Sequence, residues 1–197
     1  MVKERCGWCE SSPTMREYHD TEWGFPTTDD RRLFEKINLE GFQSGLSWKT
    51  VLDKRDDFRR VFHGFDPEIV ARMKERDVVR LLGDASIIRH RGKIESTINN
   101  ARRCLELIEE KGSLAAHIWG FEPPRRPVAP TVAEVSTFVT SAESVALSKD
   151  LKKRGWSFVG PTTMYAFMQS MGLVNDHHAG CFVHEAAEKA RKRIRIG

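Results

Sequence analysis

Apolar residues recur at helical spacing along most of the chain. Between about 30 and 43, four of them fall on one face of a helix, namely Leu33, Phe34, Ile37 and Phe42. Asp29 and Asp30 precede this stretch and can cap its first turn. A longer stretch with the same spacing reaches about Lys111. Apolar and polar residues nowhere alternate over the length of a useful strand, so the pattern predicts an all-α fold.

Start and stop signals predict the remaining helices. Ser47 begins a short one, and Asp66 followed by a proline opens another. A further helix is predicted from about 141 to 154, and Pro161 opens one that runs to about 171. The proline-rich stretch 122–130 is typical of a surface connection. We therefore expect one domain over 1–197, made of two helical sub-bundles linked near 120–132, with a basic tail over 186–197.

Residues 1–26 lack any helical or strand period. Four aromatic residues lie there among glycine, proline, serine and threonine: Trp8, Tyr18, Trp23 and Phe25. Such a segment usually packs as an irregular cover over a core, and aromatic rings with polar tips also suit a pocket for a flat polar ligand.

The composition indicates the cellular compartment but not the binding partner. The chain has 197 residues, of which 30% are charged, and no apolar run approaches the length of a membrane helix. Its opening residues hold no apolar signal core, so we expect a cytoplasmic protein. Four cysteines do not make a disulfide framework at this length. A net charge of +4 permits a polyanionic partner but does not argue for one.

Cysteine and histidine residues at the two ends of the chain could form one metal site. His177 and Cys181 are four residues apart, which on a helix places both side chains on one face. Cys6 and His19 could supply two more ligands, and a Cys2His2 set gives zinc the closed shell of a structural site. The site would then tie the termini together. The spacing fits no local zinc motif, and a surface thiol at Cys6 with a helix-capping His177 explains it equally well.

A second candidate site lies between the two helices of the final third. The first ends in Lys152, Lys153 and Arg154, a glycine-containing connection over 155–160 follows, and Pro161 opens the next. A helix that begins with proline directs its first amides outward, which suits a phosphate. This is the logic of a helix-hairpin-helix contact with a DNA backbone. An ordinary antiparallel helix pair with solvated lysines is the alternative. The basic stretch 88–93 likewise fits either a phosphate contact or a solvated helix start.

Several ordered motifs together resemble the 3-methyladenine DNA glycosylase I family, from Cys6 to about Cys181. They are Cys6-Gly-Trp8, Tyr18-His19-Asp20, Glu22-Trp23-Gly24, Leu39-Glu40-Gly41, Gln43-x-Gly-Leu-Ser-Trp48, Ile88-Arg-His-Arg-Gly-Lys93, Phe158-Val-Gly160 and Gly172-Leu-Val-Asn-Asp-His177. The resemblance implies an all-α helix-hairpin-helix glycosylase. It also implies a structural zinc ion held by Cys6, His19, His177 and Cys181.

The resemblance further implies a pocket for an extruded base. A base alkylated at N3 is cationic, and electron-rich aromatic faces favour it over neutral adenine by cation–π attraction. By resemblance, Trp8, Tyr18 and Trp48 form the cavity, with Trp23 nearby. Glu40 would be the one carboxylate, accepting hydrogen bonds from the base edge and adding a negative charge. Taken singly, each aromatic is better explained by core packing, and Glu40 is better explained by an exposed helix face.

The same resemblance assigns the DNA contacts. Gly45 and Leu46 match the turn that fills the gap left by the extruded nucleotide. Lys153, Arg154, Gly160 and Thr162 belong to the hairpin that would hold the backbone. Two residues depart from the family pattern. Met15 stands where an aromatic is expected, so one pocket wall differs. Pro161 replaces a hydroxyl residue, which still suits the hairpin but donates no amide.

For the reaction, the resemblance implies monofunctional, hydrolytic excision of 3-methyladenine from alkylated double-stranded DNA by a monomer. Water would attack the sugar carbon, without a covalent intermediate. Asp176 is the only carboxylate shortly after the hairpin, and we expect it to orient His177 instead of acting on the sugar.

Two other classes of protein fit parts of the sequence. One is a zinc-stabilised helical module that binds DNA or damage without catalysis. The other is a thiol oxidoreductase built on the Cys6-Gly-Trp-Cys9 spacing, although such motifs normally follow a strand.

Overall fold

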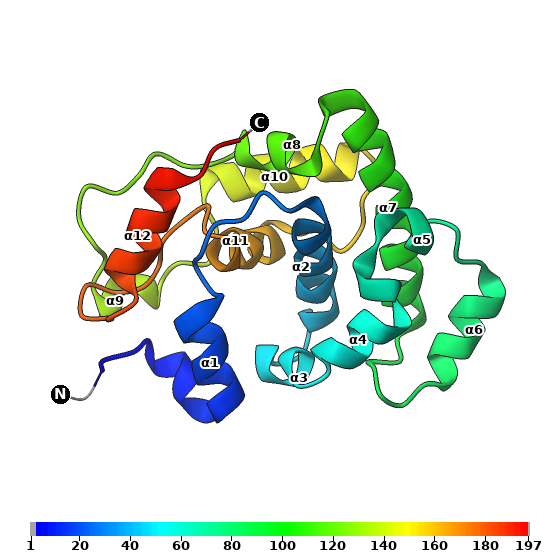
Figure 1. Ribbon diagram of the computed structural model, residues 1–197, viewed down its shortest axis with the longest axis horizontal. Helices are drawn as coiled ribbons and strands as arrows, with labels where there is room; N and C mark the ends of the chain where they lie inside the picture. Colours follow the sequence, from blue (N-terminus) through cyan, green and yellow to red (C-terminus); the bar gives the residue numbers. More distant parts are fainter. Residues whose placement is uncertain (1–2, 197) are drawn as a thin grey trace.

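The computed structural model describes residues 3–196, and every regular element in this range is helical. Figure 1 shows the helices gathered around α2, with the N-terminal segment and α12 at the same end of the molecule. In chain order the elements are η1 (Gly7–Ser11), α1 (Pro13–Thr21), α2 (Asp30–Gln43), α3 (Trp48–Leu52), α4 (Arg55–Val61), η2 (His63–Phe65), α5 (Pro67–Val70), α6 (Glu75–Gly83), α7 (Arg91–Lys111), α8 (Leu114–Trp119), α9 (Val132–Val135), α10 (Ala142–Lys153), α11 (Pro161–Ser170) and α12 (His184–Arg193).

Helix α2 is the centre of the core. It contacts α3, α7, α8 and α11, and its buried residues are Leu33, Phe34, Lys36, Ile37, Asn38, Leu39, Glu40, Gly41 and Phe42. The Asp29 carboxylate caps its start, accepting from the backbone amides of Arg31 and Arg32 at 2.9 and 3.1 Å. Asp30 accepts from the Ala115 amide at 2.8 Å, which fixes α8 to the first turn. The predicted cap and apolar stripe are confirmed.

Helices α10 and α11 pack closely against each other. The connection between them is held from inside: Ser148 Oγ donates to the Val159 carbonyl at 2.6 Å, and the Asn100 side chain pairs with both backbone groups of Ser157 at 3.0 and 3.1 Å. Gly155 has φ of 83° and Phe158 has φ of 56°. These buried hydrogen bonds hold the tight turn in place and offset the strain of a positive φ at the non-glycine residue Phe158.

The basic stretch before α7 has a structural role. His90 caps the helix by accepting from the Lys93 amide at 3.2 Å. The Lys93 ammonium is buried and donates to the carbonyls of Phe42 and Ser44 at 2.8 and 2.6 Å. Lys93 therefore holds the end of α2 and the start of the Gly45–Leu46 turn, so this lysine does not face phosphate.

The expectation of an irregular cover over residues 1–26 is wrong. Ser12 accepts from the Met15 amide at 3.2 Å and Pro13 occupies the first helical position, so residues 13–21 form a capped helix. The helix is short and buries only Met15, Tyr18 and His19, which is too few positions to display a period in the sequence. It belongs to a small second core with Cys6, Trp23, Leu52, Cys181 and Val183.

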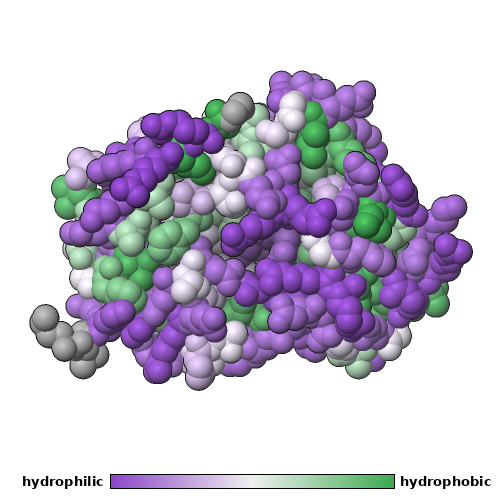
Figure 2. All heavy atoms as spheres, viewed as in Figure 1, coloured by the Kyte–Doolittle hydropathy of each residue, from purple (hydrophilic) through white to green (hydrophobic). Residues whose placement is uncertain are grey.

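Hydrophilic residues cover most of the face seen in Figure 2, with small apolar patches between them. Within residues 3–196, none of the helices has the length and apolar character needed to cross a membrane.

Candidate functional site

Cys6, His19, His177 and Cys181 meet in one buried cluster, and their four ligand atoms lie within 4.8 Å of one another. Cys181 Sγ lies 3.4 Å from both His19 Nε2 and His177 Nδ1, and Cys6 Sγ lies 3.7 Å from His177 Nδ1. Four ligands at about 2.0–2.3 Å from one zinc ion are separated from each other by about 3.3–3.8 Å. These side chains could therefore hold a tetrahedral metal ion.

Both imidazoles in the cluster are oriented by outside partners. His19 Nδ1 donates to Asp20 at 2.8 Å, and His177 Nε2 donates to the Trp23 carbonyl at 3.0 Å. In each ring the opposite nitrogen is left with a lone pair directed into the cluster. A hydrogen bond from the Cys6 thiol lowers the pKa of the Cys181 thiol, so a thiolate is favoured there. The donor set fits a metal ion.

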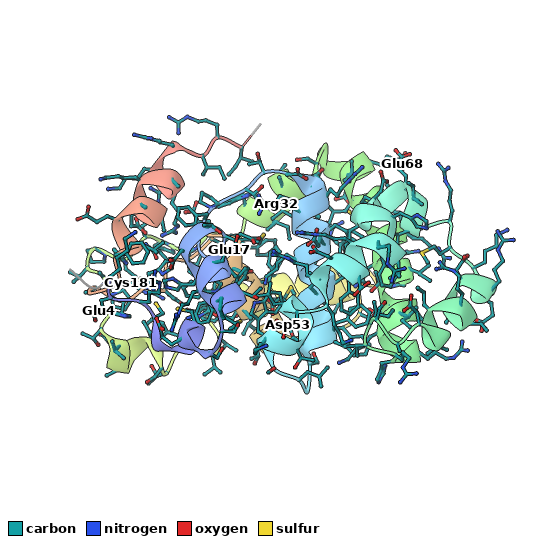
Figure 3. All side chains as sticks on the ribbon, turned by 60° about the horizontal axis from the view of Figure 1, so that its bottom comes forward. Glu4, Glu17, Arg32, Asp53, Glu68 and Cys181 are labelled. Atoms are coloured by element: carbon teal, nitrogen blue, oxygen red, sulfur yellow. The ribbon has the colours of Figure 1, made fainter. Side chains whose placement is uncertain are left out.

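Two details of the predicted cluster need correction. His177 and Cys181 lie in the non-helical segment before α12, so a turn brings them together, not one helix face. The alternative of a surface thiol is also wrong, because Cys6 is only 3% exposed. In Figure 3 Cys181 lies beside Glu4, whose carbonyl accepts from the Phe182 amide at 3.1 Å. The cluster thus joins the two ends of the chain.

Asp176 does not orient His177, contrary to expectation. Its carboxylate is fully buried and accepts from Arg126, Tyr165 and Gln169, at 2.5, 2.8 and 2.8 Å. The Trp23 carbonyl, and not Asp176, accepts the hydrogen bond that orients His177. Asp176 therefore ties α11 to the proline-rich connection.

An open hollow of about 800 Å³ adjoins the metal-binding cluster. The residues that line it include Trp8, Met15, Tyr18, Trp23, Glu40 and Trp48, together with Val132 and Val135 from α9 and Ala166 and Gln169 from α11. Trp8 and Trp23 have ring centroids 5.1 Å apart, and Tyr18 and Trp48 have centroids 5.3 Å apart. The structure thus brings together all four predicted aromatic residues and the predicted carboxylate, and Met15 forms part of the same wall.

Glu40 is buried on α2, at 5% exposure, so the alternative of an exposed helix face is wrong. Its Oε1 lies 2.9 Å from the ammonium of Lys36, one turn earlier. Lys36 was not singled out from the sequence, because a Lys–Glu pair four residues apart usually lies on a solvated face. A signal was present: Leu33, Lys36 and Glu40 share the spacing of the buried stripe.

The Cys6-Gly-Trp-Cys9 spacing does not form a reactive dithiol. Cys6 faces the metal-binding cluster, and Cys9 is buried outside it. Burial raises the pKa of the Cys9 thiol to about 11, which leaves little thiolate near neutral pH. The oxidoreductase alternative therefore lacks its nucleophile.

The predicted DNA-contacting residues occupy two neighbouring turns. Gly45 has φ of 81°, and Leu46 beside it is 43% exposed. The α10–α11 connection lies next to the end of α2, because Phe158 packs closely over Gly41. Gly160 precedes α11 as its N-cap, and Thr162 and Lys153 are exposed. Arg154 differs from its neighbour, since it pairs with Glu110 and Asp150 at 2.6 and 2.9 Å.

Comparison with known proteins gives a consistent result. A family model described as methyladenine glycosylase matches residues 8–184. DNA-3-methyladenine glycosylase 1 of Escherichia coli (strain K12) is 52% identical over 180 residues, which cover 90% of this chain and 95% of the relative. DNA-3-methyladenine glycosylase of Haemophilus influenzae is 46% identical over 178 residues, covering 90% and 96%.

Solved structures agree. A crystal structure of 3-methyladenine DNA glycosylase I (TAG) superposes with a TM-score of 0.86 at 50% identity, covering 92% of this chain and all of the other. The Staphylococcus aureus enzyme, studied for its recognition of 3-methyladenine, superposes with a TM-score of 0.87 at 31% identity, covering 93% and 98%.

Proposed function

The chain belongs to the methyladenine glycosylase family, and we propose on this basis that it excises 3-methyladenine from alkylated double-stranded DNA. The observation that carries the proposal is the hollow of four aromatic residues around the buried Glu40. Electron-rich aromatic faces attract a cation, and the Glu40 carboxylate, which already pairs with the Lys36 ammonium, adds a negative charge to the site. The hollow therefore suits a flat cationic base better than a neutral one.

The selection follows from the chemistry of the damaged base. Methylation at N3 gives adenine a positive charge and weakens its bond to the sugar. The base must leave the stack before a protein can surround it. Inside the hollow, Trp8, Tyr18 and Trp48 would contact its faces, and Glu40 would accept hydrogen bonds from its edge. Trp23 supports Trp8 from the side.

Water is the proposed nucleophile. Among the described residues that line the hollow, Glu40 is the single carboxylate. Asp176 has its carboxylate engaged by three donors, which argues against a role beside the sugar. We infer that the enzyme is monofunctional: it extrudes the nucleotide, holds a good leaving group, and lets water attack the sugar carbon.

We assign DNA docking to the helix-hairpin-helix unit α10–α11 and to the turn at Leu46. The exposed Lys152 and Lys153 and the outward amides at Thr162 suit backbone phosphates. Leu46 would act as the apolar wedge that fills the space of the extruded nucleotide. This division predicts that docking and base selection can be changed separately.

Zinc is the ion we assign to Cys6, His19, His177 and Cys181. The set of two thiolates and two imidazoles is complete, so the ion would cross-link the two ends of the chain and leave no open position for substrate. The reaction then depends on the hollow alone.

The test is release of free base from duplex DNA treated with a methylating agent, separated by base identity. We expect 3-methyladenine to be released well ahead of any unmodified base, with no strand cleavage. A protein that binds free 3-methyladenine but releases none from DNA would instead be a damage-binding module without catalysis.

A further inference from the structure

Lys36 places a resident cation directly behind the proposed base site. Its ammonium donates to Tyr18 Oη at 2.7 Å and pairs with Glu40 Oε1 at 2.9 Å. It also lies 3.2 Å from the centroid of the Trp48 ring. All three partners line the hollow, whereas Lys36 itself lines a narrow cleft on the other side of them. The Lys36 side chain is 6% exposed.

A charged Lys36 competes with a cationic base for the same groups. It neutralises the Glu40 carboxylate, and it already occupies a face of Trp48. Two cations sharing one carboxylate repel each other in a poorly solvated site. A neutral Lys36 would leave the full charge of Glu40 and the electron density of Trp48 to the base.

The surroundings make loss of this proton accessible. Burial lowers the pKa of Lys36 to about 8, against the opposing effect of Glu40. The other charged groups near it include Arg55 from α4, which lowers the pKa further, and Glu22, which raises it. Arg32, Glu35 and Arg59 line the same cleft as Lys36, and Arg59 pairs with Glu35 at 2.9 Å. Glu22 and Arg55 largely offset each other, because they form an ion pair at 2.7 and 2.8 Å.

Tyr18 can accommodate either state of the lysine. Burial raises the pKa of Tyr18 well above its usual value, so the phenol keeps its proton. Its oxygen accepts from the ammonium now, and its O–H can donate to the amine once the proton has gone. The proton would leave to water through the cleft that Lys36 lines with Glu22 and Glu35.

Building on the proposed function, we propose that Lys36 is a positioning residue that couples capture of the cationic base to release of its own proton. In the coupled step one N–H bond of the ammonium breaks, the proton passes to water, and the positive charge of the base replaces that of Lys36 beside Glu40. The Glu40 carboxylate therefore pairs with one cation at a time.

The sign of the pH dependence follows directly. Below the pKa of Lys36 the free enzyme is charged, and binding of the base must expel a proton, so excision rises with pH by up to about tenfold per unit. Above about pH 8 Lys36 is already neutral, and the rise should level off. A lysine that served only to support the fold would give no such profile.

The experiment measures single-turnover kcat/KM on methylated duplex DNA between pH 6.5 and 9.5, roughly the window in which a lysine of this pKa titrates, for the wild type, Lys36→Met and Lys36→Arg. Methionine keeps the length without the charge, and arginine keeps the charge throughout this range. We expect kcat/KM of the wild type to rise with pH from the low value of Lys36→Arg to the higher value of Lys36→Met. The kcat/KM of each variant should not change with pH. Melting temperatures at each pH show that all three proteins are folded.

Each outcome has one meaning. A methionine variant that keeps the wild-type slope overturns the coupling, whether or not the bulkier arginine variant folds. A wild type that releases 3-methyladenine at a pH-independent rate also overturns it and leaves the proposed function intact. A wild type that releases no base at any pH rejects the proposed function itself.

Discussion

At the scale of single residues, environment matters more than residue type. Glu40, Asp176 and Lys36 would all pass for ordinary charged residues in the sequence, yet all three are buried. The resemblance to a family indicated Glu40. It gave no contacts for Asp176, and Lys36 went unnoticed because its partners come from α1 and α3 as well as from its own helix.

Asp176 offers a test of a structural against a catalytic carboxylate. Asp176→Asn removes the negative charge that pairs with Arg126. It also replaces one buried carboxylate oxygen, which accepts hydrogen bonds, by an NH2 group, which can only donate them. We therefore expect a loss of about 1–3 kcal/mol in the free energy of unfolding. For a chain of this size that lowers the melting temperature by about 2–12 °C. Excision per folded molecule should not change.

The matched control is Asp53→Asn, which alters an exposed pair with Lys49 and should shift stability by less than about 0.5 kcal/mol. A large loss of excision in Asp176→Asn without a change in melting would show instead that Asp176 acts on the substrate.

At the scale of elements, the sequence was informative wherever a helix was long or clearly capped. Helices α2, α7, α10 and α11 begin and end close to the predicted residues. Helix α1 was missed because its buried face is so short, and the turn at 177–181 was mistaken for a helix because spacing by four also fits a turn. The local sequence pattern cannot distinguish helix from non-helical structure in these two segments, because each packs against the opposite end of the chain and this packing decides its conformation.

The α10–α11 hairpin gives a prediction at this scale. Lys152→Ala with Lys153→Ala should weaken binding to any duplex and reduce the slope of log affinity against log salt by about 0.9 for each phosphate that the variant no longer neutralises. Arg154 is left in place, because it is committed to Glu110 and Asp150. The measurement is duplex affinity across a salt series.

Lys189→Ala with Lys192→Ala is the control for this pair. It removes the same charge from α12, at the far end of the molecule from the α10–α11 connection (Figure 1). We expect its salt slope to stay close to that of the wild type. An unchanged slope in the hairpin variant, or a larger change in the α12 variant, would place DNA on another surface.

At the scale of the whole molecule, the main feature is the joining of the two ends. Cys6 and His177 are separated by 171 positions, and their proximity could not be derived from any local motif. The residue types indicated a metal site and the family resemblance gave the partners. The orienting groups, Asp20 and the Trp23 carbonyl, needed the structure.

This joining predicts a linked loss of metal and stability. Cys181→Ser should lower the zinc content below one ion per chain and lower the melting temperature together with it, because the ion would cross-link the ends. Cys9→Ser is the control, since Cys9 is equally buried and close in sequence to Cys6 but lies outside the cluster. Metal analysis and thermal melting of both variants test this, and a fully loaded Cys181→Ser protein would contradict it.

The central claim is that Glu40 selects a cationic base which the rest of the molecule delivers. Glu40→Gln keeps the size of the side chain but removes its charge. Because a mispaired polar group in a desolvated site costs about 1–3 kcal/mol, and more for a charged partner, excision should fall at least about tenfold. Duplex affinity should hardly change, because docking is assigned to the hairpin.

The most direct measurement is therefore single-turnover release of 3-methyladenine from methylated duplex by the wild type, Glu40→Gln and Glu17→Gln. Glu17→Gln is the same substitution at an exposed position of α1, and this variant should release base at the wild-type rate. Our account predicts a loss of at least about tenfold in release per folded molecule in Glu40→Gln alone, at equal duplex affinity, together with a lower melting temperature because Lys36 loses its buried partner. Equal release rates in all three folded proteins would contradict it.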